Sequence, residues 1–156
     1  MSIDSSTKKT GAALFVDGQF KEYRLIDFSD NKSVNDRMNL MGRELQELLS
    51  RWKPELVVIE EPNGYGKNIQ VYRYLSEIIG IVRIWAFMHS CVMEEIKPTV
   101  WRKRIGINQS KKKRYELKAE SIAYVKKTYG LEVNDDVADA ICIGACLYTE
   151  NEDEYK

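Results

Sequence analysis

A short run of apolar residues, positions 56–59 (Leu-Val-Val-Ile), constrains the fold of this chain more than any other feature. Pro54 stands before the run and two glutamates follow it, so the run has the length of one strand. A strand with apolar residues at every position is buried on both faces. The run therefore predicts a central strand covered on both sides, with Glu60 at its carboxyl end.

The residues before this strand predict an antiparallel meander of three strands. Residues 2–5 begin a short strand, residues 11–16 are apolar, and residues 20–28 alternate well enough to form the returning strand. Asp17-Gly18 separates the second from the third, and both residue types tolerate positive φ in a hairpin turn. The first of the three strands contains an aspartate.

The rest of the chain alternates helical and strand patterns. A capping box at Ser33 starts a helix over residues 33–52, and apolar residues recur at three and four positions over 68–89. Further along we expect a strand over 91–96, a helical turn over 97–101, and helices over 110–129 and 134–148. The order βββαβαβαα gives an α/β domain, with a mixed sheet of three antiparallel strands followed by parallel strands and flanked by helices. We expect one domain over residues 1–148 and a flexible tail over 149–156.

The composition of the 156-residue chain excludes several classes of protein. Hydrophobic residues make up 44% and charged residues 31%, which is typical of a soluble globular domain. No apolar run approaches the roughly 18 residues of a membrane span, and the N-terminus has no apolar signal-peptide core. Three cysteines without paired spacing indicate reduced thiols, so we expect a cytoplasmic protein with no membrane partner. Residues 63–67 lack the spacing of a phosphate-binding P-loop, so we expect no nucleotide cofactor.

Charge is distributed unevenly along the chain although the formal net charge is zero. Residues 97–118 contain nine basic residues and one acid, whereas residues 131–156 contain eight acids and one base. A basic segment beside an acidic one is typical of a phosphate-binding surface next to a cation site. The alternative is two solvated faces that offset each other's charge.

Two carboxylates stand at strand positions. Asp4 lies inside the first strand, where an aspartate is either a ligand or an ordinary edge residue. Glu60 follows the four apolar residues, at the end of a strand where open α/β sheets bind their ligands. Burying an unpaired carboxylate costs several kcal/mol, so Glu60 must face a cation or pair with a Lys or Arg.

Three more acids open the last predicted helix. Asp135 and Asp136 stand where acids favour the helix dipole, and this role alone explains Asp135. Asp139 lies deeper, in a helix that is apolar on all sides and therefore buried. Asp136 and Asp139 are three residues apart, so they share one face of the helix.

Together, Asp4, Glu60, Asp136 and Asp139 predict a metal centre. Four carboxylates beside apolar sequence repel one another unless divalent cations lie among them, and oxygen ligands without His or Cys select Mg²⁺ or Mn²⁺ over Zn²⁺. Two such ions about 3.5 to 4 Å apart activate water and stabilise the leaving oxygen in phosphodiester hydrolysis. The basic segment before the last helix would neutralise nucleic-acid phosphates.

The segments that contain the four carboxylates resemble the motifs of the RuvC-type Holliday-junction resolvases, a family of the ribonuclease H-like superfamily. They follow one another in the same order as in that family. The first is a strand-borne Asp4 followed by a polar turn and the pair Thr10-Gly11. Residues 58–60 (Val-Ile-Glu) resemble the second motif, and residues 136–140 (Asp-Val-Ala-Asp-Ala) resemble the closing one. The resemblance extends over nearly the whole chain, and the short length and lysine-rich loops resemble the phage-encoded branch of the family.

The resemblance implies a magnesium-dependent endonuclease that cuts four-way DNA junctions as a homodimer, in the host cell cytoplasm if it is phage-encoded. A lysine of the basic helix assists the scissile phosphate in the family. Lys118 is the nearest candidate here, and the cluster of Lys111, Lys112, Lys113 and Arg114 offers alternatives. The long helix that follows the central strand would make the dimer contact. The apolar positions of this helix that allow a dimer contact are Leu75, Ile78, Ile79 and Val82. Packing in the core of the monomer explains them equally well.

Further contacts with branched DNA are expected from the loop after the central strand and from the basic segment. In the loop, Tyr65 and Lys67 are candidates, and Tyr65 either stacks on a junction base or is an ordinary loop tyrosine. Candidates in the basic segment are Arg102, Lys103, Lys111, Lys112, Lys113 and Arg114. Bacterial relatives have an aromatic residue sooner after the second motif, which leaves open whether other branched DNAs are substrates.

Two other functions fit the sequence. The same four acids would serve a ribonuclease H-type nuclease that cuts an RNA–DNA hybrid, although the closing Asp-x-x-Asp helix favours the resolvase. A non-catalytic branched-DNA-binding module with this fold would lack at least one acid, and none of the four is missing.

Overall fold

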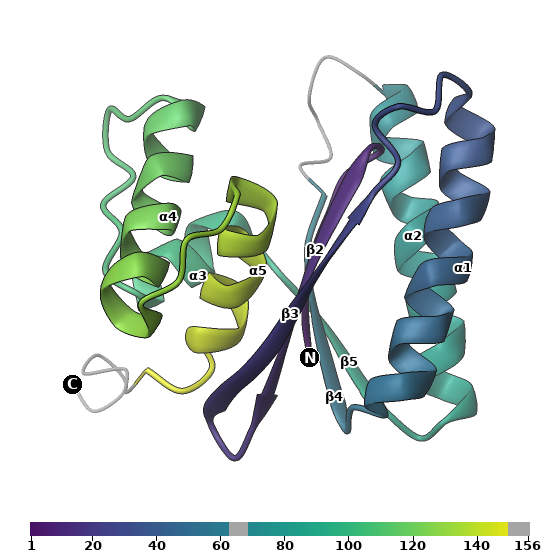
Figure 1. Ribbon diagram of the computed structural model, residues 1–156, viewed down its shortest axis with the longest axis horizontal. Coiled ribbons are helices and arrows are strands. Elements are labelled where there is room, and N and C mark those ends of the chain that lie inside the picture. The colour runs from purple at the N-terminus through teal and green to yellow at the C-terminus, as the bar shows by residue number, and fades with distance from the viewer. Residues whose placement is uncertain (63–68, 150–156) are drawn as a thin grey trace.

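A five-stranded mixed sheet separates two layers of helices (Figure 1). The computed structural model describes residues 1–62 and 69–149, so the predicted tail over 149–156 is described only at Thr149. The strands are β1 (Ser2–Ser5), β2 (Lys9–Val16), β3 (Gln19–Asp27), β4 (Leu56–Glu60) and β5 (Val92–Ile96). The helices are α1 (Val34–Trp52), α2 (Ile69–Met88), α3 (Pro98–Arg104), α4 (Arg114–Tyr129) and α5 (Asp135–Ala145). Figure 1 shows α1 and α2 on one side of the sheet and α3, α4 and α5 on the other.

The strands lie in the order β3-β2-β1-β4-β5. The first three strands pair antiparallel, while β4 pairs parallel with both β1 and β5. This arrangement confirms the predicted mixed sheet of antiparallel strands followed by parallel ones. Asp17 and Gly18 have φ angles of 51° and 74°, which confirms the predicted hairpin turn between β2 and β3.

Three helices differ from their predicted bounds, and one of them, α5, ends at Ala145 where the prediction runs to residue 148. The basic helix α4 begins later than predicted, because Lys111 has a left-handed φ of 60° that helical backbone cannot contain. The Lys113 N–H then donates to the Glu116 carboxylate over 2.7 Å and caps the new start. A seven-residue helix, α3, replaces the predicted turn. No helix within residues 1–62 or 69–149 is long and apolar enough to cross a membrane.

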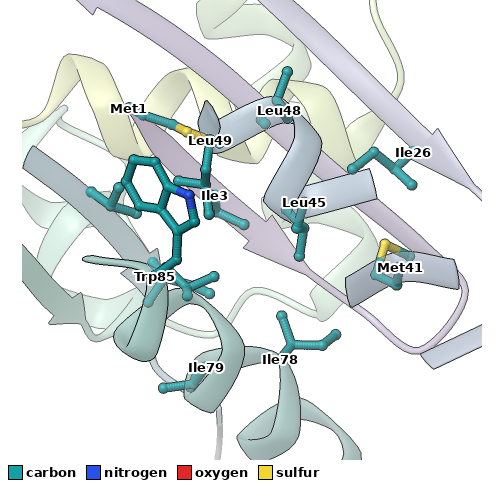
Figure 2. Packing of buried hydrophobic residues seen from close by; sticks show 14 of the residues in the cluster. Met1, Ile3, Ile26, Met41, Leu45, Leu48, Leu49, Ile78, Ile79 and Trp85 are labelled. Atoms are coloured by element: carbon teal, nitrogen blue, oxygen red, sulfur yellow. The ribbon is translucent and has the colours of Figure 1, made fainter. Parts of the chain in front are cut away.

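Both faces of the central strands are buried, which confirms the prediction from residues 56–59. Val57 and Ile59 pack with α1 and α2 in one core, whereas Val58 belongs to a second core with α3, α4 and α5. Figure 2 shows Ile3 of β1 in the first core, among apolar side chains from α1 and α2. The alternation of side chains along a strand explains this division.

Helix α2 packs into the first core through Ile78, Ile79 and Val82, which are all buried (Figure 2 labels the first two). Of the two explanations left open for these three positions, core packing is therefore correct and a dimer contact is not. Leu75 is partly buried against the same core.

Helix α5 lies unusually close to the sheet at two glycines. A Cβ on Gly11 of β2 would lie 2.0 Å from the Asp136 carbonyl oxygen, and a Cβ on Gly144 would lie 2.2 Å from the Phe15 ring. The Ser2 hydroxyl also donates to the Ala140 carbonyl over 2.7 Å. The absence of side chains at these glycines lets α5 rest directly on β1 and β2, near its start at Gly11 and near its end at Gly144.

Candidate active site

Two carboxylates occupy neighbouring positions on the central strands. In the parallel pair of β1 and β4, Ile3 lies opposite Ile59, so the next residues in this register are Asp4 and Glu60. Ile3 and Ile59 face α1 and α2. Because successive side chains point to opposite faces, Asp4 and Glu60 face the layer of α3, α4 and α5.

Two more carboxylates come from the start of α5. The Asn134 side chain accepts a backbone N–H over 3.0 Å and caps the helix, so Asp136 lies in its first turn and Asp139 follows at the next position on that face. Gly11 pairs with Asp4 across β1 and β2 and also contacts the Asp136 backbone. This close contact brings the start of α5 to the strand position of Asp4.

All four predicted carboxylates, those of Asp4, Glu60, Asp136 and Asp139, line one cleft of about 580 Å³. The cleft also contains three cationic side chains, those of Arg102, Arg114 and Lys118. None of the described residues that line it is His or Cys. The cleft thus combines hard oxygen donors with cations suited to phosphate.

Burial and mutual repulsion raise the pKa values of these carboxyl groups. The pKa of Asp4 is raised well above its usual value, first by burial and then by the Glu60 carboxylate. Burial is also the largest cause that raises the pKa values of Glu60, Asp136 and Asp139. A nearby cation would reverse these shifts, because it stabilises the ionised form of a carboxyl group.

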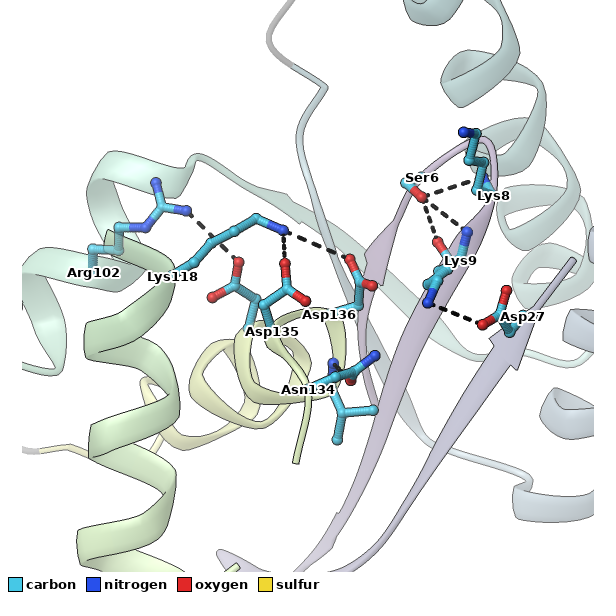
Figure 3. Close-up of polar contacts among 11 residues, drawn as sticks. Ser6, Lys8, Lys9, Asp27, Arg102, Lys118, Asn134, Asp135 and Asp136 are labelled. Atoms are coloured by element: carbon cyan, nitrogen blue, oxygen red, sulfur yellow. Dashed lines mark hydrogen bonds and ion pairs between the residues drawn. The ribbon is translucent and has the colours of Figure 1, made fainter. Parts of the chain in front are cut away.

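Lys118 of α4 contacts both aspartates at the start of α5 (Figure 3). Its ammonium group forms an ion pair with Asp135 and lies 3.8 Å from the Asp136 carboxylate. Burial acts to lower the pKa of Lys118, but the hydrogen bond to Asp135 and the surrounding carboxylates outweigh it, and the pKa is raised. The role predicted for Asp135, interaction with the helix dipole alone, is therefore wrong, because Asp135 also holds Lys118 in place.

Helix α3 contributes two consecutive side chains to the cleft region. The Trp101 indole N–H donates to Glu60 Oε2 over 2.7 Å. The Arg102 guanidinium lies 4.5 Å from the centre of the Trp101 ring, and its Nη2 lies 3.9 Å from Asp139 Oδ2. Arg102 Nε and Asp139 Oδ1 are buried and have no hydrogen-bond partner in the described part of the chain. Such unpaired buried groups are rare in proteins and require an explanation.

Three of the four carboxylates contact other protein groups instead of meeting at one point. Within residues 1–62 and 69–149, no three acidic, His or Cys side chains lie close enough together to hold a metal ion as they stand. The partners are Trp101 for Glu60, Arg102 for Asp139 and Lys118 for Asp136.

The residues predicted to bind DNA lie in different surroundings. Arg102 and Arg114 line the cleft, and Lys112 forms an ion pair with Glu120. Three further residues predicted to bind DNA have exposed side chains and do not line the cleft: Lys103, Lys111 and Lys113. Tyr65 and Lys67 lie outside the described residues.

The strand order, the mixed strand directions and the acidic cleft define a ribonuclease H-like α/β domain. No family model matches the chain. Two relatives named crossover junction endodeoxyribonuclease RuvC, from Brachyspira hyodysenteriae and Caldicellulosiruptor saccharolyticus, are each 24% identical to it over 97% of this chain. The alignments cover 94% and 98% of those relatives. A protein of the same name from Syntrophomonas wolfei is 27% identical over 94% of this chain and 86% of its own length.

Solved structures share the fold at low sequence identity. RuvC of T. thermophilus in complex with Holliday junction substrate has a TM-score of 0.71 and 17% identity, and the match covers 92% of this chain and 88% of that one. The yeast mitochondrial Holliday junction resolvase Ydc2 has a TM-score of 0.56 and 14% identity. The match covers 92% of this chain and 75% of Ydc2. The chain is thus RuvC-like in sequence and ribonuclease H-like in fold, which confirms the resemblance seen in its motifs. The phage-encoded branch stays a prediction.

Proposed function

We propose that this chain is a cytoplasmic, metal-dependent endonuclease that resolves four-way DNA junctions. The main support is the convergence of Asp4, Glu60, Asp136 and Asp139, from three separate elements, on one cleft with cationic side chains. The relatives carry the name crossover junction endodeoxyribonuclease, and a fold neighbour is in complex with Holliday junction substrate. The chemistry of the cleft and the names of the relatives support the same class of reaction.

Mg²⁺ is the proposed cofactor, with Mn²⁺ as a substitute, and the cleft suits such ions. Asp139 Oδ1 is a buried acceptor without a described donor, and burial raises the pKa values of the four carboxyl groups. Both features are expected where a cation compensates buried carboxylates. The residues that would hold the ions are Asp4, Glu60, Asp136 and Asp139. When bound, the ions supply water activation and stabilisation of the leaving 3′ oxygen.

The cationic side chains act on the phosphates of the DNA. Lys118, which Asp135 holds beside Asp136, would neutralise the charge that develops on the scissile phosphate. Arg102 and Arg114 would bind phosphates within the cleft. Lys118 and Arg102 also offset part of the charge of Asp136 and Asp139, so both cations lie beside the carboxylates that would hold the metal.

Cleavage of labelled synthetic nucleic acids tests this proposal. The substrates are a four-way junction, a three-way junction, a flap, a plain duplex and an RNA–DNA hybrid, each incubated with Mg²⁺ and with EDTA. We expect paired nicks in the four-way junction, much slower cleavage of the duplex, and no cleavage in EDTA because the reaction needs the metal.

Other outcomes would replace the proposal. Cleavage of the hybrid alone would keep the carboxylate centre but identify a ribonuclease H-type enzyme. Junction binding without cleavage in either Mg²⁺ or Mn²⁺ would favour a branched-DNA-binding module. Cleavage of the three-way junction and the flap as well would widen the substrate range to branched DNA in general.

Replacing Lys118 with Gln tests its role at the phosphate. We expect the cleavage rate constant to fall about 100-fold, while junction affinity in EDTA changes little, because one charge-stabilising donor is lost in the transition state. The control is Lys126→Gln, on the same helix, where the ion pair with Glu132 (2.8 Å) lies outside the cleft lining. Equal rates for the two variants would contradict the role of Lys118.

A homodimer is proposed through the exposed end of α2. Ile84, Phe87 and Met88 are 62%, 87% and 72% exposed. Phe87 and Met88 follow Ile84 by three and four positions, so each lies on the same face of the helix as Ile84. Contiguous exposed apolar side chains on a soluble domain mark an interaction surface, and a second copy of this chain is the occupant we propose. These residues replace the buried positions of α2 at which the sequence placed the contact.

Replacing Phe87 with Asp should weaken this dimer. We expect the dissociation constant from sedimentation velocity to rise at least about tenfold, because a central aromatic contact is worth more than roughly 1.4 kcal/mol. Tyr23→Asp, at an exposed position of β3, is the control and should leave association unchanged. Unaltered association of Phe87→Asp would exclude this face, and a monomeric wild type would exclude the dimer.

A further inference from the structure

Trp101 joins the second core to the carboxylate cleft. Its side chain is fully buried and packs in the core shared by α3, α4 and α5. Its indole N–H donates over 2.7 Å to Oε2 of Glu60, at the carboxyl end of β4. A buried indole N–H needs an acceptor, and here the acceptor is one of the four carboxylates of the cleft.

The residue that follows Trp101 strengthens this arrangement. Arg102 stacks over the indole ring at 4.5 Å and lies 3.9 Å from Asp139. Consecutive residues of one short helix therefore contact two different carboxylates, one on the sheet and one on α5. The Ile107 N–H donates to the Arg102 carbonyl over 2.8 Å, which ties the end of α3 to the following loop.

We infer that Trp101 is a positioning residue of the metal centre: its N–H holds Oε2 of Glu60 and so fixes the orientation of a carboxylate that would bind the cation. The inference rests on the proposed function, because it assigns a role at the metal centre named there. Groups that hydrogen-bond a metal ligand fix its orientation, and their loss typically lowers metal affinity about 10–100-fold. Because Trp101 is fully buried and its N–H is taken up by Glu60, it acts through Glu60.

A pair of tryptophan variants tests the inference without DNA cleavage. Trp101→Phe keeps an aromatic ring beneath Arg102 but removes the N–H donor. Trp85→Phe is the matched control, because it removes the indole hydrogen bond to Ser50 (3.2 Å) in the other core. Mn²⁺ binding is measured by isothermal titration calorimetry. We expect Trp101→Phe to weaken Mn²⁺ binding about tenfold or more and Trp85→Phe to leave it unchanged.

Two ligand variants separate the failure of this inference from the failure of the proposed function. If Asp4→Asn and Asp139→Asn both weaken Mn²⁺ binding while Trp101→Phe binds as tightly as Trp85→Phe, the positioning role is overturned and the metal centre stands. If neither aspartate variant changes Mn²⁺ binding, the proposed metal centre itself fails, and the inference fails with it.

A second measurement keeps Trp101 in place, in case Trp101→Phe does not fold. The chain has three tryptophans, so replacing Trp52 and Trp85 with Phe leaves the Trp101 indole as the single indole N–H signal in an NMR spectrum. We expect this signal to shift on titration with Mg²⁺, because the ion binds the same carboxylate that accepts the N–H. The midpoint of the shift should equal the midpoint of metal binding. An indole signal that stays fixed while other signals of the cleft shift would overturn the inference.

Discussion

Replacing Asp4 with Asn should remove nearly all cleavage and, at the same time, stabilise the metal-free protein. We expect the cleavage rate constant to fall roughly a thousandfold or more, because a lost metal ligand removes several kcal/mol of transition-state stabilisation. We expect the free energy of unfolding in EDTA at pH 7 to rise by about 0.5–2 kcal/mol, because a buried carboxyl group beside other carboxylates is removed. Stopped-flow cleavage and chemical denaturation measure the two effects.

The sign of the stability change follows from the raised pKa of Asp4, which burial causes first and the Glu60 carboxylate second. A carboxyl group whose pKa is higher in the folded than in the unfolded chain contributes its full stability below its unfolded pKa of about 4. That contribution is lost as the pH rises through the folded pKa. The ionised Asp4 therefore opposes folding at neutral pH, and the advantage of Asn should shrink as the pH falls toward about 4.

Asp27→Asn is the matched control, and its effect has the opposite sign. Hydrogen bonds from Ser29, followed by one from Lys9, lower the pKa of Asp27 to about 2. A lowered pKa contributes stability above the unfolded pKa that is lost as the pH falls through the folded one. Asp27→Asn should therefore be slightly less stable than wild type at neutral pH. An Asp4→Asn variant that is also less stable would contradict the account of the cleft electrostatics.

Replacing Gly11 with Ala should damage stability and cleavage together. The new Cβ would lie 2.0 Å from the Asp136 carbonyl oxygen, so β2 and the start of α5 must move apart. Overpacking of this kind typically costs about 1–3 kcal/mol. The same movement carries Asp136 away from Asp4, and a displacement of about 1 Å at a reacting centre can cost roughly 100-fold in rate. Thermal unfolding and junction cleavage of one preparation measure both losses.

Gly80→Ala is the control for this prediction. No described heavy atom outside the helix backbone lies within 4 Å of a Cβ at Gly80, in the middle of α2. The substitution should stabilise the helix by up to about 1 kcal/mol and leave cleavage unchanged. If Gly11→Ala behaved in the same way, the close approach of α5 to β2 would not be what positions Asp136.

Much of the fold could be predicted because its determinants are local. The apolar run before Glu60 predicts a strand buried on both faces, and Asp17-Gly18 predicts the hairpin from two residues alone. The convergence of Asp4 and Glu60 could also be predicted, since functional groups gather at the carboxyl ends of parallel strands. Once the central strands pair in parallel, the side-chain alternation places both carboxylates on one face.

Contacts between distant elements could not be predicted from the sequence. Lys118 and Asp135 are 17 positions apart, and Trp101 and Glu60 are 41 apart, so their hydrogen bonds depend on how the helices pack. The indole of Trp101 lies beside three basic residues in the sequence, and nothing local distinguishes a core tryptophan from one that also binds a carboxylate. The exposed face of α2 could not be separated from its buried face, because both contain large apolar residues.

A reduced side-chain volume should have different effects in the two cores that lie on opposite faces of the sheet. Asp4 and Glu60 belong to strands whose spacing is set by backbone hydrogen bonds, whereas Asp136 and Asp139 belong to a helix whose position depends on side-chain packing. A cavity beneath α5 would therefore shift one half of the centre against the other and lower the rate before the chain unfolds. A cavity of equal size beneath α1 and α2 would lower stability without altering the geometry of the centre. The enzyme should consequently tolerate more core substitutions in the α1–α2 layer than in the layer that contains α5.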